Sequence, residues 1–291
     1  MILLEKHLVP LLEKPIRLQE YGIGIFATKP TRSGFKKAIK KELVYVNGSV
    51  ASTAIFIKGN ELIELYKEEN SNVKEFIFPL NVIFEDDHLA IIHKPAGILV
   101  NGNSFATIQN ALAKNVQKSS QKDAVAPRTV HRLDYPTSGL LLTGKTSSTI
   151  IALSKLFEYK RIQKTYLAVT LGTMDSEGII NSPIDEKEAL TTYTVIASVT
   201  SERFGFLNLV RLEPKTGRKH QLRKHLFEIG TPILGDKDYF LEDLISYGNG
   251  LYLHAYKLDF IHPVTQKQLT ITSAIPKKIS RIFPNVQVDA S

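Results

Sequence analysis

The hydrophobic positions along the chain follow two spacings, which together predict short strands interrupted by single helices. Apolar residues recur every third or fourth position over 31–43, 147–159 and 218–229, as is typical of amphipathic helices. Short apolar runs bounded by turn residues indicate strands, for instance over 44–49 and 82–94. Because the strands come in runs without regular strand–helix–strand alternation, the pattern favours an α+β fold with a mixed, largely antiparallel sheet.

A polar and charged stretch, 67–74, interrupts this pattern and is interpreted as a linker. We therefore expect two domains in the 291 residues, a small α/β domain over 1–78 and a larger one over 79–291. In the larger domain, Ser104 is expected to cap a helix that runs to Asn115.

The balance of charge favours a polyanionic partner. The chain has 37 Lys and Arg against 29 Asp and Glu, which gives a formal net charge of +8. Such a balance is typical of proteins that bind nucleic acid, although it also serves solubility alone. Lys36, Lys37 and Lys40 lie opposite the apolar side of the helix expected at 31–43, in a stretch without acidic residues. We expect this basic side to contact nucleic-acid phosphates.

Composition excludes several other classes of site. The chain has no cysteine, which rules out disulfides, thiolate metal sites and cysteine nucleophiles. It has no apolar run near the roughly 20 residues that span a bilayer, and its start does not resemble a signal peptide. Neither metal-binding histidine spacing nor a glycine-rich nucleotide loop is present, so we expect no metal and no cofactor. We expect a cytoplasmic monomer without membrane contact.

One carboxylate stands out because it lies in a polar turn directly before an apolar strand. Asp134 follows Arg132, whose cation can lower the pKa of the carboxylate or hold a phosphate. Thr137–Gly139 supply hydroxyls, N–H groups and conformational freedom, and Leu140–Leu142 anchor the turn in a buried strand. Most aspartates in turns only bind their own backbone, but this setting makes Asp134 a candidate nucleophile.

Two further segments carry candidate chemistry. Half of the residues in 215–224 are Lys or Arg, and Gly217 is expected to open a helix whose N-terminus suits phosphate. The alternative is a basic helix on the surface. Arg223 of this segment could point inward to pair with a carboxylate. Tyr166 lies in an expected strand, where a tyrosine is more often a core residue than a catalyst.

Taken together, these segments resemble the RluA-type family of pseudouridine synthases, and they stand in the family's order from about Pro79 to Pro276. The N-terminal unit is similar, more loosely, to the S-four-type RNA-binding domain that is often fused to these enzymes. The segments that carry the resemblance are 83–97, 131–142, 164–168, 217–236, 253–255 and 260–263.

The resemblance implies an RNA-modifying reaction. A uridine leaves its helix, its N-glycosidic bond is broken, and the uracil is rejoined to ribose through C5 without a metal or cofactor. Asp134 would act on the ribose, either through a covalent adduct or by assisting the departure of uracil. Tyr166 would pack on the flipped base and help remove the C5 proton, and Arg223 would keep Asp134 ionised. The implied substrate-binding residues are His131, Arg132, Thr137, Arg218, His220, Gln221 and Leu222.

The substrate is expected to be large ribosomal RNA, with transfer RNA as the alternative. Two other function classes stay open. One is an RNA-binding protein without activity. The other is a glycoside or nucleoside hydrolase, which would need a second carboxylate, such as Asp185 or Asp236, beside Asp134.

Overall fold

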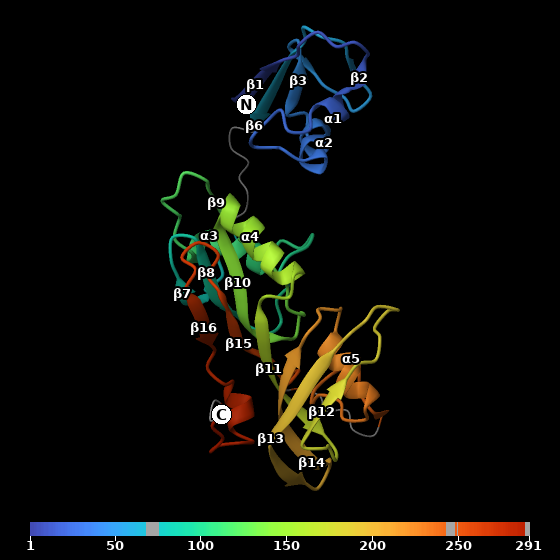
Figure 1. Ribbon diagram of the computed structural model, residues 1–291, viewed down its shortest axis with the longest axis vertical. Helices are drawn as coiled ribbons and strands as arrows, with labels where there is room; N and C mark the ends of the chain where they lie inside the picture. Colours follow the sequence, from blue (N-terminus) through green and yellow to red (C-terminus); the bar gives the residue numbers. More distant parts are fainter. Residues whose placement is uncertain (68–75, 243–247, 249, 289–291) are drawn as a thin grey trace. The chain divides into compact units, whose positions relative to one another are not determined.

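The computed structural model describes residues 1–67, 76–242, 248 and 250–288. The chain divides into two compact units, Met1–Lys74 and Glu75–Ser291 (Figure 1). The predicted linker, apart from Lys67, lies outside the described residues.

The N-terminal unit is built on a four-stranded antiparallel sheet in the order β1-β6-β3-β4. Helix α2 packs on this sheet because Phe35 and Ile39 on one of its sides are buried with Ile63 and Leu65. Thr31 caps the helix by accepting a 3.1 Å hydrogen bond from the main-chain nitrogen of Gly34. The elements are β1 (Ile2–Leu8), β2 (Ile16–Arg17), α1 (Leu18–Tyr21), α2 (Arg32–Lys40), β3 (Val44–Val46), β4 (Ser49–Val50), β5 (Phe56–Ile57) and β6 (Leu62–Lys67).

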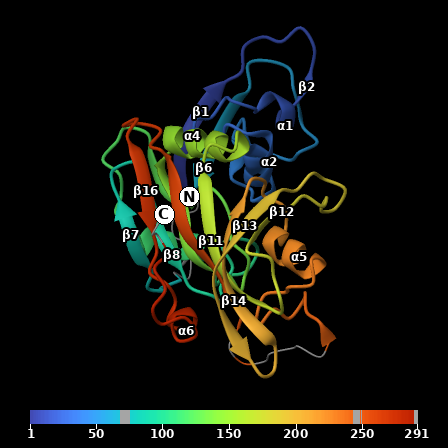
Figure 2. The same ribbon diagram turned by 60° about the horizontal axis from the view of Figure 1, so that its bottom comes forward.

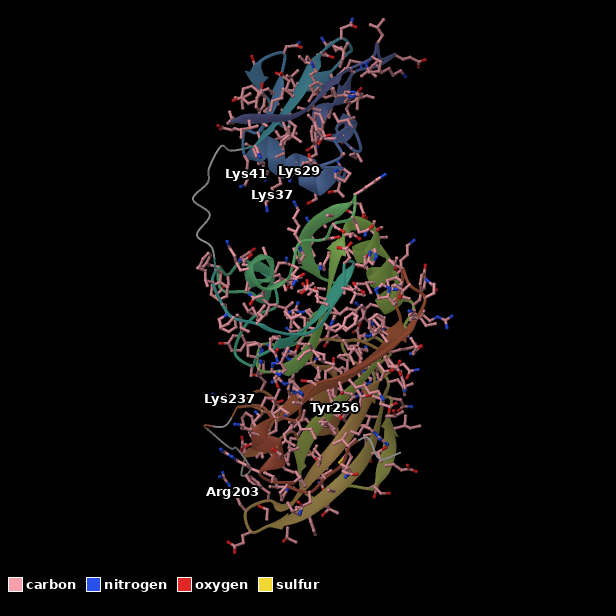
Figure 3. All side chains as sticks on the ribbon, turned by 90° about the vertical axis from the view of Figure 1, so that its left-hand side faces the viewer. Lys29, Lys37, Lys41, Arg203, Lys237 and Tyr256 are labelled. Atoms are coloured by element: carbon pink, nitrogen blue, oxygen red, sulfur yellow. The ribbon has the colours of Figure 1, made fainter. Side chains whose placement is uncertain are left out.

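The opposite side of α2 is basic. Lys36, Lys37 and Lys40 are exposed there, as the sequence pattern predicts. Figure 3 shows Lys37 and Lys41 extending outward from this unit. The helix therefore presents an apolar side to its own sheet and a row of ammonium groups to solvent.

The larger unit is built on one sheet in the order β12-β13-β14-β11-β15-β10-β8-β7, with β16 beside β15 and β9 beside β10. Strands β10 and β15 are parallel where they pair, whereas the other pairs among the described residues are antiparallel. The predicted α+β class with a mixed, largely antiparallel sheet is thus confirmed.

The strands of this unit are β7 (Asn81–Glu85), β8 (Leu89–Lys94), β9 (Ala124–Thr129), β10 (Ser138–Thr146), β11 (Gln163–Leu171), β12 (Glu177–Ile180), β13 (Thr191–Ser201), β14 (Gly205–Pro214), β15 (Leu253–Ile261) and β16 (Gln268–Thr272). The helices are α3 (Ile108–Asn115), α4 (Ser147–Glu158), α5 (Gln221–Glu228) and α6 (Lys277–Ser280). Figures 1 and 2 show α4 beside the β9–β10 part of the sheet and α5 beside the β12–β14 part.

Strand β10 is buried on both faces, which explains its continuous apolar run. Leu141 packs with Ile108 and Leu112 of α3 on one face. Leu140 and Leu142 pack with α4 on the other. Successive side chains of a strand point to opposite faces, so a strand covered on both faces favours apolar residues at successive positions, as over Leu140–Leu142. The turn that holds Asp134 is therefore attached to the interior of the unit.

Three local predictions were wrong. Helix α3 begins at Ile108 and is capped by Thr107 rather than Ser104. Helix α5 begins at Gln221 rather than near Gly217. The backbone of His220, directly before it, is left-handed (φ 56°), so the helix cannot extend further toward the N-terminus. The polar residues over 119–126 predict a loop, but strand β9 begins at Ala124, because β10, the next strand along the chain, pairs with it and places Thr129 opposite Thr143.

Candidate active site

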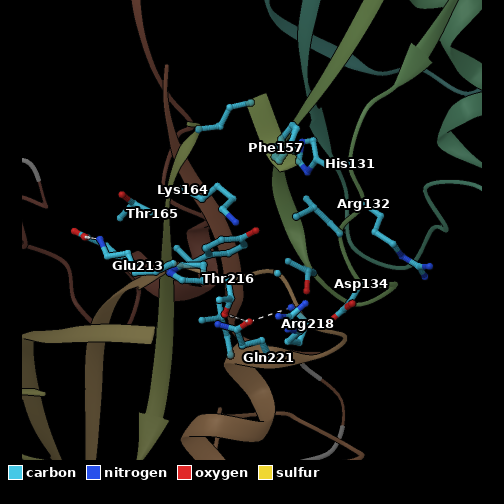
Figure 4. A pocket seen from close by; sticks show the side chains of 18 of the residues that line it. His131, Arg132, Asp134, Phe157, Lys164, Thr165, Glu213, Thr216, Arg218 and Gln221 are labelled. Carbon is cyan, nitrogen blue, oxygen red and sulfur yellow. Dashed lines mark hydrogen bonds and ion pairs between the residues drawn. The ribbon is translucent and has the colours of Figure 1, made fainter. Parts of the chain in front are cut away.

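A cavity of about 940 Å³ opens where three segments meet: the turn before β10, the start of β11, and the segment from β14 into α5 (Figure 4). The cavity lining includes Asp134 from the first segment, Tyr166 from the second and His220 from the third. These residues are distant in sequence. The structure therefore brings together side chains that the sequence pattern predicts only as separate candidates.

The turn that carries Asp134 is fixed by hydrogen bonds from a buried lysine. Lys94, at the end of β8, is fully buried, and its ammonium donates to the main-chain oxygens of Pro95 (2.9 Å), Tyr135 (3.2 Å) and Thr137 (2.7 Å). Burial lowers the pKa of Lys94 to about 8, while the negative charge of Asp134 opposes this shift. Lys94 is not among the site residues predicted from the sequence; the available signal is a lysine at the end of an apolar strand, directly before a proline.

The turn is also tied to the neighbouring strand β15. Gly139 pairs with Ala255, and a side chain at Gly139 would come within 2.2 Å of the Ala255 main-chain oxygen. Ser138 shares a 2.9 Å hydrogen bond with Nδ1 of His254, a fully buried residue. The close approach of β10 and β15 therefore depends on the absence of a side chain at position 139.

Tyr166 enters the cavity from β11, which pairs with β14 and β15. Burial, together with the nearby charge of Asp134, raises the pKa of the Tyr166 phenol far above its usual value. The ring is thus a neutral phenol in the vicinity of the carboxylate across the physiological range.

Arg223 does not pair with Asp134, and the predicted pairing is wrong. Its guanidinium donates to both oxygens of Asp236, at 2.7 and 2.6 Å, and to Asp238 at 2.7 Å. Arg223 and Asp236 are both almost completely buried, so each supplies the counter-charge that the other needs. The guanidinium also lies over the ring of Tyr239, 5.0 Å from its centre.

Gln221 and His131 were predicted to bind substrate, but their polar atoms are used within the protein. The Gln221 amide oxygen accepts from Thr216 (2.7 Å) and from the Arg218 main-chain nitrogen (3.0 Å), while its amide nitrogen donates to Leu190 and Thr191. This saturates the amide. Gln221 therefore fixes the shape of the loop before α5.

His131 supports the neighbouring strand in a similar way. Its Nε2 accepts a 2.9 Å hydrogen bond from the main-chain nitrogen of Leu142, and its ring stacks on Phe157 at 4.6 Å. Burial lowers the pKa of His131 to about 3, helped by the charge of Lys164. A neutral ring in this place accepts the backbone hydrogen bond and is not available as a cation for phosphate.

The other predicted substrate-binding residues of this unit line the cavity. Arg132 is exposed, and Arg218 is anchored by a 2.8 Å hydrogen bond from its Nε to the oxygen of Glu188. Thr137 is buried, and its hydroxyl has no hydrogen-bond partner among the described residues. Leu222 is buried in the core beside the cavity. These placements leave the two arginines at the cavity as candidate contacts for phosphate.

His220 faces the carboxylate of the candidate nucleophile, Asp134. Its Nε2 is 3.9 Å from Oδ1 of Asp134, and its Nδ1 is 3.1 Å from the hydroxyl of Tyr239. Both His220 and Asp134 expose about a fifth of their side chains. The pair therefore remains accessible from the cavity.

The two carboxylates considered for a hydrolase, Asp185 and Asp236, do not line the cavity that holds Asp134. Asp185 forms an ion pair with Lys224 at 2.8 Å, and Asp236 is engaged by Arg223. Neither belongs to the cavity lining.

Over the part of the chain that the structure describes, no group of three His, Asp or Glu residues could hold a metal ion. Across the same residues, no helix combines the length and apolar character needed to cross a membrane.

Comparisons with known proteins agree with this arrangement. Residues 88–228 match the family model described as RNA pseudouridylate synthase. Ribosomal large subunit pseudouridine synthase D of Nitrosomonas europaea is 31% identical over 88% of this chain and 80% of its own length. Transfer RNA pseudouridine synthase C of Pasteurella multocida is 34% identical over 68% of this chain and 93% of its own length.

A solved structure extends the likeness to the fold. Human RNA pseudouridylate synthase domain containing 4 superposes with a TM-score of 0.59 at 25% identity, over 72% of this chain and 94% of that one. The resemblance inferred from the sequence is thereby confirmed for the larger unit. The chain belongs to the RNA pseudouridylate synthase family, and it is an RNA pseudouridine synthase.

Proposed function

We propose that this enzyme converts a specific uridine of large ribosomal RNA into pseudouridine, with Asp134 as the residue that acts on the ribose. The observation that carries the proposal is the placement of Asp134 in the cavity, on a turn fixed by Lys94 and next to Tyr166. The relatives named as ribosomal large subunit synthases support ribosomal RNA as the substrate, and transfer RNA is the alternative.

The cavity is large enough to take a nucleotide turned out of its helix, and the aspartate and tyrosine suit the two halves of such a nucleotide. Asp134 would engage the sugar as the glycosidic bond breaks, and Tyr166 would pack on the uracil while it turns. The high pKa of Tyr166 favours this packing role over a role as a free base. Arg132 and Arg218 would hold the flanking phosphates.

The N-terminal unit would add affinity for RNA. Its exposed lysines, Lys36, Lys37 and Lys40, form a compact basic surface of the kind that binds phosphates without reading sequence. The likeness of this unit to an S-four-type domain remains a proposal of ours. We further propose that the enzyme is cytoplasmic and monomeric. Light scattering after gel filtration would test the monomeric state.

The decisive experiment uses large-subunit ribosomal RNA and transfer RNA, both transcribed with tritium at uracil C5. Tritium release without free uracil is expected from ribosomal RNA, and mapping of the product then locates the pseudouridine. Free uracil would instead indicate a hydrolase, and release from transfer RNA alone would identify the alternative substrate. The variant Asp134→Asn is expected to lose turnover, and full activity of that variant would contradict the proposal.

A further inference from the structure

The contact between His220 and Asp134 suggests a role that the reaction itself does not require. The Nε2–Oδ1 distance of 3.9 Å is too long for a direct hydrogen bond. It is, however, the separation of two groups that can both reach one small atom in the cavity. An oxygen about 2.8 Å from each would see them at an angle of about 90°, which a hydroxyl oxygen accommodates.

The tautomer of His220 decides what such an atom must be. Burial lowers the pKa of His220, as do the charges of Arg223 and Lys219, whereas Asp134 and Asp238 act in the opposite direction. A neutral imidazole carries one N–H. The Tyr239 hydroxyl is 3.1 Å from Nδ1 and can donate to it, which leaves the hydrogen on Nε2, facing the carboxylate.

The backbone at His220 supports this orientation. The residue has a left-handed conformation (φ 56°, ψ 25°) directly before α5, and its ring meets the ring of Tyr239 edge-on at 5.7 Å. Tyr239 is in turn covered by the buried guanidinium of Arg223. The network that is anchored by Arg223 and Asp236 thus holds the imidazole of His220 in place without contacting the carboxylate of Asp134.

An atom between these groups must donate to Asp134 and accept from His220. A carbonyl or phosphate oxygen can only accept, and a base N–H can only donate, whereas a hydroxyl does both. Within an RNA strand the 3′ and 5′ oxygens of each ribose are esterified, so the free hydroxyl of the sugar is the 2′-OH. This group is also the feature that distinguishes RNA from DNA.

We propose that His220 and Asp134 together bind the 2′-OH of the flipped uridine, and that His220 thereby makes the enzyme selective for ribose over deoxyribose at this position. The proposal rests on the proposed function, in which Asp134 engages the sugar of the target nucleotide. Tyr239 is a positioning residue in this scheme, because it acts only through the tautomer of His220.

The test compares two synthetic RNAs that span the mapped uridine and differ only in having uridine or 2′-deoxyuridine at that site. For each protein, kcat/KM is measured by tritium release, and Kd by fluorescence anisotropy. Wild type is expected to favour ribose by about tenfold or more, since one hydrogen bond to a charged or polar group is of that order. His220→Ala is expected to lower this preference about tenfold, by slowing the ribose substrate while leaving the deoxyribose substrate nearly unchanged.

Three variants separate this role from a structural one. His220→Gln keeps an N–H near the place of Nε2 and is expected to retain much of the preference. Tyr239→Phe keeps the ring but frees the tautomer, so the preference should fall severalfold. Lys215→Ala removes a cation of the cavity that is not among the charges acting on His220, and it should weaken both substrates equally. Circular dichroism and the Tm of each variant check folding, and Tyr239→Phe decides the matter if His220→Ala does not fold.

Equal losses on both substrates in His220→Ala, or an unchanged preference in Tyr239→Phe, would overturn the proposal. Failure of the proposed function has a different signature. In that case wild type itself releases no tritium from any RNA, or releases free uracil. A wild-type enzyme that isomerises uridine and deoxyuridine equally well would refute the role of His220 while leaving the isomerase assignment intact.

Discussion

The ammonium of Lys94 donates a 2.7 Å hydrogen bond to the main-chain oxygen of Thr137, three residues after Asp134. The main-chain oxygen of Tyr135, in the same turn, also accepts from this group, as does that of Pro95, which follows Lys94 in the chain. A single buried cation thus replaces the repeated backbone pairing that a strand would have, and it holds an irregular turn in one conformation. The rigidity of the candidate nucleophile depends on a residue that does not face the substrate.

Replacing Lys94 by Met is expected to reduce kcat by at least about tenfold, because the carbonyl oxygens around Asp134 lose their donor and the turn relaxes. The matched control makes the same substitution at an exposed lysine of α4. Lys155→Met should leave kcat unchanged, because this lysine is not buried beneath the turn. Tritium release under saturating RNA measures the effect. A Lys94→Met enzyme with wild-type kcat would show that the clamp does not matter for the reaction.

The same lysine predicts a dependence of stability on pH. Its pKa is lowered from 10.5 to about 8 in the folded chain. Between these values the unfolded chain holds a proton that the folded chain has released, so the free energy of unfolding rises with pH across this window. Urea unfolding of wild type between pH 7.5 and about 10.5 should show this rise relative to Lys94→Met. Parallel curves for the two proteins would contradict the lowered pKa.

Gly139 is expected to tolerate no side chain. Alanine there would combine a strained backbone (φ 117°) with an approach of 2.2 Å to the oxygen of Ala255. We expect a loss of at least about 2 kcal/mol in the free energy of unfolding, together with reduced activity. Gly205→Ala is the matched control, since that glycine also has a positive φ (71°) but has open space around it. Equal losses in both variants would show that the approach to β15 costs nothing.

Local patterns in the sequence were sufficient for part of this picture. The apolar run after Asp134 predicts a strand buried on both faces, because each of its residues must meet a hydrophobic layer. The periodic apolar residues of α4 predict a helix for the same reason. These features depend on near neighbours in the chain, and the fold class follows from their order.

Pairings between distant residues could not be obtained in this way. Arg223 had several carboxylates to choose from, and nothing in the spacing favours Asp236 over Asp134. The choice is made by the fold, which buries Arg223 and Asp236 side by side. Gln221 looks like a polar contact for substrate, yet its amide is consumed by the loop that it closes. The parallel contact of Gly139 with Ala255 leaves no local signal at all.

The corrected pairing of Arg223 makes a prediction about stability. Arg223→Met would leave the buried carboxylate of Asp236 without its counter-charge, and the free energy of unfolding should fall by about 3–5 kcal/mol. Adding Asp236→Asn removes that charge and should recover part of the loss. Asp134→Asn serves as the comparison, with lost turnover but a stability change below about 1 kcal/mol. Urea unfolding measures all four proteins, and the absence of recovery in the double variant would argue against this buried pair.

The ring of Tyr166, rather than its hydroxyl, is expected to dominate the binding of RNA. Stacking of a base on an aromatic ring contributes about 1–3 kcal/mol, and a phenol with a strongly raised pKa brings no charge to the contact. In an Asp134→Asn background, which prevents turnover, Tyr166→Phe should bind the target RNA within about threefold of its parent. Tyr166→Leu should bind at least about fivefold more weakly, because the side chain stays apolar but no longer offers an aromatic ring on which the base can stack. Fluorescence anisotropy with a labelled RNA gives the three dissociation constants. If Phe weakens binding as much as Leu does, the hydroxyl carries the interaction, and the packing role proposed for Tyr166 is wrong.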